Sequence, residues 1–267
     1  MIIAAIFRIM GFAGLVVRDG DLVTASGRLV RNQAGDWFEP PVWVAAVGGG
    51  PQVVRPVSPV AVRISGADFD ELATRFEDGH GTVEGLAALT GIWSAGYLHV
   101  QHQTVPGPID ARVPRWVTPP CPAPAGGWPR HGDNLCFDLN DLPDTGVVVA
   151  VTVFRPGQDQ EVLVVAAIDA AAAEALLRPQ FGERLCVVIS RWTTAELDAV
   201  HAHLHARRRA WKLLQVGQST GEDGQACIAA KLTRVLPEIA SWAASLPAGI
   251  VSLDPWLRRV HPQPSDP

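Results

Sequence analysis

Apolar and polar residues alternate along the first hundred positions in the way that β-strands require. Val60, Val62 and Ile64 alternate with less apolar neighbours, and Leu98 and Val100 repeat the pattern later in the chain. A period of two places successive side chains on opposite faces of a strand. The pattern predicts five strands, at residues 22–31, 36–47, 60–65, 83–93 and 97–103, with a short helix at residues 68–76. The predicted order is therefore three strands, one helix and two further strands.

Glycines inside these predicted strands indicate that the sheet bends. Gly27, Gly85 and Gly91 each interrupt a strand, where glycine commonly marks a bulge or a sharp bend. The strands of a small barrel need such bends to close on themselves. We therefore expect residues 1–104 to form a five-stranded β-barrel with a capping helix, an architecture used more often for binding than for catalysis.

The order and spacing of these elements resemble an OB-fold (oligonucleotide/oligosaccharide-binding) domain. The resemblance covers residues 22–103, about a third of the chain, and rests on the element pattern rather than on a motif. It implies an OB-like β-barrel whose ligands bind the face of the second and third strands. On that face this chain carries Trp37, Phe38, Trp43 and Arg63. The resemblance also makes nucleic acid one class of expected ligand.

Residues 105–146 differ from the segments on either side because they are rich in proline and lack a sustained period. The prolines include Pro106, Pro108, Pro114, Pro119, Pro120, Pro122, Pro124 and Pro129. Proline fixes φ and has no N–H donor, so this run can be neither a helix nor an inner strand. Trp116, Trp128 and Phe137 are costly to leave in water. We therefore expect an extended, Pro-rich strap that lies on one or both flanking domains.

Residues 147–267 alternate between strand-like and helix-like stretches, which is typical of an α/β domain. The pattern predicts strands at residues 147–154, 161–168, 185–189, 211–218, 225–235 and 250–253, and helices at residues 170–177, 193–210 and 236–245. A capping box, Thr193 and Glu196, opens the longest helix. A strand–helix–strand order implies a parallel pair and a hairpin implies an antiparallel one. We expect a mixed-sheet α/β domain over residues 147–267.

The opening residues 1–17 are apolar except for Arg8. The segment is short for a membrane span, and a charge in its middle would be costly there. We expect a first strand or a packed arm ahead of a turn at Asp19–Gly20. A translation start placed too far upstream and a membrane anchor are the alternatives, and a membrane is not an expected partner.

The charge of the chain bears on its partners. The net charge is −5 at pH 7, and residues 1–104 carry seven arginines against ten carboxylates. Asp36 and Glu39 lie beside the aromatic residues of the implied ligand face. Because binding to a phosphate backbone depends on clustered cations, a protein or peptide partner is favoured over single-stranded nucleic acid.

Single-stranded nucleic acid nevertheless stays as an alternative partner. Bases would stack on aromatic rings and phosphates would meet arginines along one groove. The residues that would bind in this way are Trp37, Trp43, Trp93, Arg28, Arg31 and Arg63.

The four cysteines show no paired C-x-x-C spacing. Cys186 and Cys227 lie in apolar runs and are interpreted as small buried side chains. Cys121 and Cys136 flank His131, which leaves a metal site as an alternative, although zinc sites usually show tighter spacing. A reducing cytoplasm fits these cysteines better than a disulfide framework.

A basic cluster lies at the end of the longest predicted helix. Three histidines fall away from its apolar face, and without the glutamate of an H-E-x-x-H motif they predict a solvated surface rather than a zinc site. These histidines are His201, His203 and His205. Arg207, Arg208 and Arg209 follow, near the helix C-terminus where cations are favourable. An anion-binding patch at these three arginines is the alternative interpretation.

The sequence lacks the motifs of the common enzyme classes. It contains neither a G-x-S-x-G elbow nor a phosphate-binding or dinucleotide-binding glycine motif. We therefore assign no catalytic residue, cofactor or metal ligand. The expected function is that of a cytoplasmic, two-domain, non-enzymatic binding or accessory protein with a protein or peptide partner. An enzyme of unknown class with its site at the domain interface is a further alternative, because pockets favour domain junctions.

Overall fold

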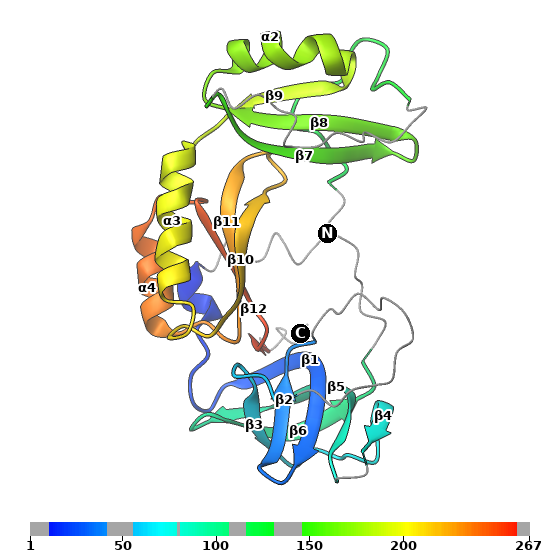
Figure 1. Ribbon diagram of the computed structural model, residues 1–267, viewed down its shortest axis with the longest axis vertical. Helices are drawn as coiled ribbons and strands as arrows, with labels where there is room; N and C mark the ends of the chain where they lie inside the picture. The colour runs from blue at the N-terminus through cyan, green and yellow to red at the C-terminus, as the bar shows by residue number, and fades with distance from the viewer. Residues whose placement is uncertain (1–10, 42–55, 79–80, 107–115, 131–145, 261–267) are drawn as a thin grey trace, which may run out of the picture.

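A computed structural model describes residues 11–41, 56–78, 81–106, 116–130 and 146–260 of this protein. In Figure 1 the barrel lies at the lower end, the β7–β8–β9 sheet at the upper end, and the β10–β11–β12 sheet between them. The barrel strands are β1 (Leu22–Asn32), β2 (Gly35–Glu39), β3 (Val62–Ser65), β5 (Val83–Ser94) and β6 (Tyr97–Thr104). This order of strands agrees with the five predicted from the alternating pattern.

The barrel closes because β1 pairs with two other barrel strands. The strand order is β1-β2-β3-β6-β5, and an additional antiparallel pairing joins β1 to β5. The β3–β6 pair is parallel, whereas the other pairs within the ring are antiparallel. The result is a closed five-stranded barrel of mixed strand direction, which is compatible with an OB-like barrel.

Two glycines are required where the barrel strands come closest together. A Cβ on Gly27 would lie 2.3 Å from the backbone oxygen of Glu39, and one on Gly91 would lie 2.2 Å from that of His99. The β5–β6 register shifts between Thr90 and Gly91, which is the signature of a bulge. The sequence-based prediction of a bulge or bend is confirmed at Gly91, whereas Gly27 pairs with Ala87 without a register shift and is required by the close approach alone.

The prediction of a helix at residues 68–76 is wrong. The structure has bends there, followed by the short edge strand β4 (Ala73–Glu77), which pairs with β5. The Asp68 carboxylate accepts a hydrogen bond from the Asp70 N–H at 2.8 Å, and the Gln103 amide donates to the backbone oxygens of Asp68 and Glu71. These side-chain bonds satisfy the backbone in a non-helical conformation and so compete with helix formation.

The C-terminal half consists of two successive units with the same topology. In each unit an antiparallel hairpin is followed by a helix and by a strand that lies parallel to the second hairpin strand. The first unit comprises β7 (Val148–Gly157), β8 (Gln160–Ala167), α2 (Ala170–Phe181) and β9 (Leu185–Ile189), and the second comprises β10 (Leu213–Thr220), β11 (Ala226–Leu232), α4 (Pro237–Ser245) and β12 (Val251–Pro255). The single mixed sheet that we expected is therefore two separate three-stranded mixed sheets.

Helix α3 (Thr194–Ala206) connects the two units. The predicted capping box is confirmed, because the Thr193 hydroxyl accepts from the Glu196 N–H and the Glu196 carboxylate accepts from the Thr193 N–H. The helix is shorter than predicted and ends at Ala206 rather than at residue 210. Helix α2 is longer than predicted and passes through Pro179, because Phe181 is buried against the sheet one half-turn later.

Part of the Pro-rich strap covers one face of the β7–β8–β9 sheet. Trp116 and Trp128 pack against a buried cluster that contains Phe154. Cys121 forms a disulfide with Cys186 of β9. The pairing contradicts the interpretation of Cys186 as a free buried thiol, and it removes Cys121 from the metal site considered with Cys136 and His131, which lie outside the described residues. The cytoplasmic location, which rested on reduced cysteines, stays a prediction.

Each half of the chain contributes a short segment to the core of the other half. The one-turn helix η1 (Phe12–Leu15) and Val16 belong to the core of the second unit, and Val16 bridges to Val235. In return, Leu257 is buried in the barrel core and the short strand β13 (Arg258–Arg259) pairs with β1. Residues 12–16 are therefore a packed arm rather than a strand. No helix within the described ranges has both the length and the apolar character needed to span a bilayer.

Candidate functional site

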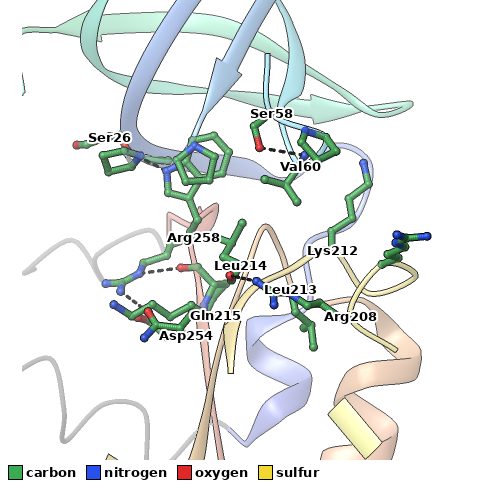
Figure 2. Close-up of a pocket in the computed structure, with 18 of the residues that line it drawn as sticks. Ser26, Ser58, Val60, Arg208, Lys212, Leu213, Leu214, Gln215, Asp254 and Arg258 are labelled. Atoms are coloured by element: carbon green, nitrogen blue, oxygen red, sulfur yellow. Dashed lines mark hydrogen bonds and ion pairs between the residues drawn. The ribbon is translucent and has the colours of Figure 1, made fainter. Parts of the chain in front are cut away.

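A crevice of about 1450 Å³ lies between the barrel and the second unit (Figure 2). Its barrel wall comes from β1, from the residues after β2 and from those before β3. Its other wall comes from the end of α3, from β10, β11 and β12, and from β13. The barrel wall includes Thr24, Ser26, Pro40, Pro41, Ser58, Pro59 and Val60. The crevice thus lies at the junction that the sequence analysis considered for an enzyme site.

Positive charge gathers on one wall of this crevice. Five cationic side chains line it: Arg208, Arg209, Lys212, Lys231 and Arg258. Lys212 and Lys231 are the only lysines of the whole chain. Asp254 is the one carboxylate in the lining, and it pairs with Arg258 at 2.7 Å. Within the described ranges no carboxylate pairs with Arg209, Lys212 or Lys231, so the wall carries an excess of positive charge.

Strand register places Lys231 and Asp254 side by side. Lys231 of β11 lies opposite Gln215 of β10 and opposite Asp254 of β12. Their neighbours Ala230 and Leu253 point to the other face, where they are buried in the core beneath α3 and α4. Alternation along the strands therefore directs Lys231 away from the helices and into the crevice.

The turn between α3 and β10 supplies the remaining cations. Trp211 is 7% and Leu213 is 3% exposed, so the exposed Lys212 lies between two buried anchors. The Arg208 guanidinium donates to the backbone oxygen of Leu214 at 3.1 Å, which holds it along the start of β10. Figure 2 shows Lys212 extending from this turn toward the barrel wall that carries Val60.

A buried ion pair fixes the barrel wall. Glu39, at the end of β2, is 1% exposed and is held by the Arg28 guanidinium. Its second carboxylate oxygen accepts from the Ser58 N–H at 2.8 Å. Arg28 also pairs with Glu84 of β5 at 2.6 Å. Because the same carboxylate holds Ser58 and Arg28, the loop that lines the crevice is fastened to the barrel.

The predicted anion-binding patch is divided by the structure. Arg208 and Arg209 line the crevice. Arg207 lies elsewhere: its guanidinium is 5.5 Å from the centre of the Trp211 ring and 3.2 Å from Nδ1 of His203. The patch that the crevice presents therefore contains Lys212 and Lys231 in place of Arg207.

Most of the described residues that were predicted on the OB-like ligand face are buried or already have a partner. The Arg63 guanidinium lies 4.4 Å from the centre of the Trp37 ring. These two residues are opposite each other on β2 and β3 and form a cation–π stack. Phe38 is fully buried and Trp93 is 3% exposed; both belong to the barrel core, which leaves them no free ring face for a base. Trp43 lies outside the described residues. Only the pair of Trp37 and Arg63 fits the predicted stacking role by its position.

The other two predicted arginines are neutralised by carboxylates. Arg28 is held between Glu39 and Glu84, as described above. Arg31 makes two hydrogen bonds to Asp36, at 2.8 and 2.9 Å, and these bonds raise the pKa of Arg31. A guanidinium that is already paired adds little attraction for a phosphate. Of the three predicted arginines of the barrel, only Arg63 has no carboxylate partner within the described residues, and more unpaired positive charge lies in the crevice.

His203 departs from the solvated surface predicted for the histidine cluster. Its ring stacks on Trp242 with centroids 4.6 Å apart, and its Nε2 is buried without a hydrogen-bond partner within the described residues. Nδ1 accepts from Arg207, a donor-only group. Burial, together with the charge of Arg207, lowers the pKa of His203. The neutral ring is therefore the form that the fold prefers.

We expect His203→Gln to reduce the pH dependence of the stability of the protein. As pH falls below the ordinary histidine pKa of about 6.5, the unfolded chain binds a proton at residue 203 before the folded chain does. Stability is therefore lost as pH falls, until the pKa of the folded state is reached. Urea unfolding at about pH 7.5 and about pH 5.5 measures this loss. A loss of the same size in His203→Gln would contradict the assignment to His203.

Comparisons with protein-family models, with curated proteins and with solved structures gave no match. Two of the five cations of the crevice, Arg208 and Arg209, were predicted from the sequence as part of an anion-binding patch. A signal for two more was present, since pairing the predicted strands 211–218 and 225–235 as a hairpin brings Lys212 and Lys231 to the same end. No signal in the sequence indicated that Arg258 or the barrel wall would join them.

Proposed function

We propose that this protein is a non-enzymatic binding protein that holds an acidic segment of a partner protein in the crevice. The observation that carries the proposal is the excess of positive charge there, five cations against one already paired carboxylate. The chain as a whole is acidic, with a net charge of −5. A local cationic surface on an acidic chain favours a partner of complementary charge and disfavours indiscriminate polyanion binding.

The size and lining of the crevice favour a chain segment over a small molecule. Its volume of about 1450 Å³ exceeds the roughly 300–1,000 Å³ that is usual for small-molecule sites. The aromatic residue in the lining is Trp256, whose ring packs against Phe38 at 4.7 Å and whose indole N–H donates to the Ser26 backbone oxygen. Few stacking surfaces and many cations suit carboxylates better than bases.

Single-stranded nucleic acid bound to the OB-like barrel is the second candidate. The stack of Arg63 on Trp37 favours it, because a base could extend such a stack. The pairing of Arg28 and Arg31 with carboxylates argues against it. We therefore rank this candidate below the acidic segment.

The proposal is tested with a fluorescein-labelled peptide of about twelve residues that alternates glutamate and serine, by fluorescence anisotropy at low salt, where exposed charges are least screened. We expect this peptide to bind and the matching peptide with glutamine for glutamate not to bind. Arg209→Glu/Lys231→Glu is expected to lose roughly a hundredfold in affinity, about tenfold for each ion pair removed.

The matched control is Arg75→Glu/Arg191→Glu, which changes the net charge equally at exposed positions outside the crevice lining. This control is expected to keep most of the wild-type affinity. Equal losses in both double variants would mean that net charge alone governs binding and would overturn the crevice as the site. Tighter binding of an oligothymidylate of similar length, lost in Arg63→Ala, would support the second candidate instead.

A further inference from the structure

Lys212 adopts a backbone conformation that lysine rarely occupies. Its φ is +48°, in the left-handed region, where a Cβ crowds the following carbonyl oxygen. Glycine adopts this region freely, and asparagine tolerates it better than lysine does. Thr74 and Ala95 are the other described residues with a side chain and a positive φ. A strained backbone at a candidate ligand site is evidence to be explained.

Hydrogen bonds, two of them from a buried threonine, hold this conformation. The Lys212 backbone oxygen accepts from both the N–H and the hydroxyl of Thr233, at 3.2 and 3.3 Å. The Lys212 N–H donates to the backbone oxygen of Arg209 at 3.2 Å. Thr233 is 1% exposed, and its hydroxyl also lies 3.5 Å from the backbone oxygen of Val60 in the barrel. The strained turn is therefore fastened at the contact between the two walls of the crevice.

The side chain that results points across the crevice. Figure 2 shows Lys212 reaching toward the barrel wall that carries Ser58 and Val60. The Ser58 N–H is bound by Glu39, and the Ser58 hydroxyl oxygen accepts from the Val60 N–H at 3.4 Å. A hydroxyl that accepts in this way still has its O–H to donate. An ammonium and a hydroxyl donor thus lie on facing walls, which is a suitable arrangement for a carboxylate.

We propose that Lys212 is a positioned binding residue of the crevice, and that it seats one carboxylate of the acidic segment against the Ser58 wall. This inference rests on the proposed function. A glycine or an asparagine would suit the backbone at this position better. The position is instead occupied by one of the two lysines of the chain, and its charge is directed into the crevice. The fold holds this charge in place at the expense of local backbone strain.

The experiment compares Lys212→Gly, Lys212→Asn and Lys212→Arg in the intact chain, with anisotropy of the glutamate–serine peptide and thermal unfolding measured on the same samples. We expect the glycine and asparagine variants to lose about tenfold in affinity, as for one charge-assisted hydrogen bond. Their Tm is expected to equal or exceed that of the wild type, by up to about 2–4 °C. Lys212→Arg is expected to retain wild-type affinity because it keeps the charge.

Ala95→Gly is the matched control, because Ala95 has φ +49° in the turn between β5 and β6 and does not line the crevice. It is expected to raise the Tm without changing affinity. Unchanged affinity in Lys212→Gly and Lys212→Asn, or a loss accompanied by a lower Tm, would overturn the role of Lys212. If Arg209→Glu/Lys231→Glu still loses affinity in that case, the proposed function stands. If the wild-type protein does not bind the peptide, the proposed function itself fails.

Discussion

Replacing Arg28 by methionine is expected to lower the free energy of unfolding by about 3–5 kcal/mol. The side chain of Glu39 is 2% exposed, and the Arg28 guanidinium is its ion-pair partner. Methionine preserves the length of the side chain but leaves a carboxylate buried with the Ser58 N–H as its remaining hydrogen-bond donor within the described residues. An uncompensated buried charge is far more costly than the loss of an exposed pair. Urea denaturation followed by tryptophan fluorescence measures the change.

Two further variants distinguish the buried charge from the lost side chain. Arg28→Met/Glu39→Gln is expected to recover part of the stability, because an amide oxygen can still accept from the Ser58 N–H and carries no charge. Arg75→Met breaks an ion pair whose partners are 43% and 54% exposed, and it is expected to cost less than about 1 kcal/mol. A cost for Arg28→Met as small as that for Arg75→Met would show that Glu39 is not buried as described.

Removing the disulfide is expected to be the second most destabilising change. Cys121 and Cys186 are separated by 65 residues, and a cross-link that closes a loop of such a length contributes about 2–4 kcal/mol, mainly by restricting the unfolded chain. The pair also holds the strap over the face of the β7–β8–β9 sheet that contains Phe154 and Val164. We expect Cys121→Ala/Cys186→Ala to unfold at lower urea concentration and to be cleaved more readily by protease within residues 116–130.

Cys227→Ala is the control for this experiment, because Cys227 is the free cysteine among the described residues. Excess dithiothreitol should shift the unfolding midpoints of the wild type and of Cys227→Ala, and should leave that of Cys121→Ala/Cys186→Ala unchanged. Mass spectrometry of a non-reduced digest should contain the cross-linked peptide. Its absence from protein refolded under oxidising conditions would contradict the disulfide.

The sequence predicted the barrel strands well because their burial follows a local pattern. The expected start of β1 and the expected starts of β5 and β6 coincide with those observed. The capping box at Thr193 and Glu196 was equally local, since both of its partners lie within one helical turn. The helix expected at residues 68–76 failed for the opposite reason. Gln103, which lies far along the chain, supplies the hydrogen bonds that hold those residues in another conformation.

The candidate site was predicted only in part. The sequence indicated a basic cluster at the end of α3, and two members of that cluster line the crevice. The aromatic and cationic residues proposed for the barrel face were identified by type and position, but their partners were not visible. Trp93 is buried and Arg28 is paired with Glu84 because of contacts between strands that are far apart in the chain. Residue type shows what a side chain can do, whereas its availability depends on neighbours that are distant in sequence.

The sequence by itself determined the alternation that makes the strands, the start of α3, the proline-rich character of the strap and the acidic total charge. Each of these depends on residues close together in the chain. Only the tertiary structure decided the partner of Cys121, the exchange of the two chain ends and the division of the C-terminal half into two sheets. It also decided that Lys212 and Lys231 share a crevice with Arg258. These outcomes depend on contacts between distant segments, because burial and charge neutralisation are set by whichever surfaces come together when the chain closes.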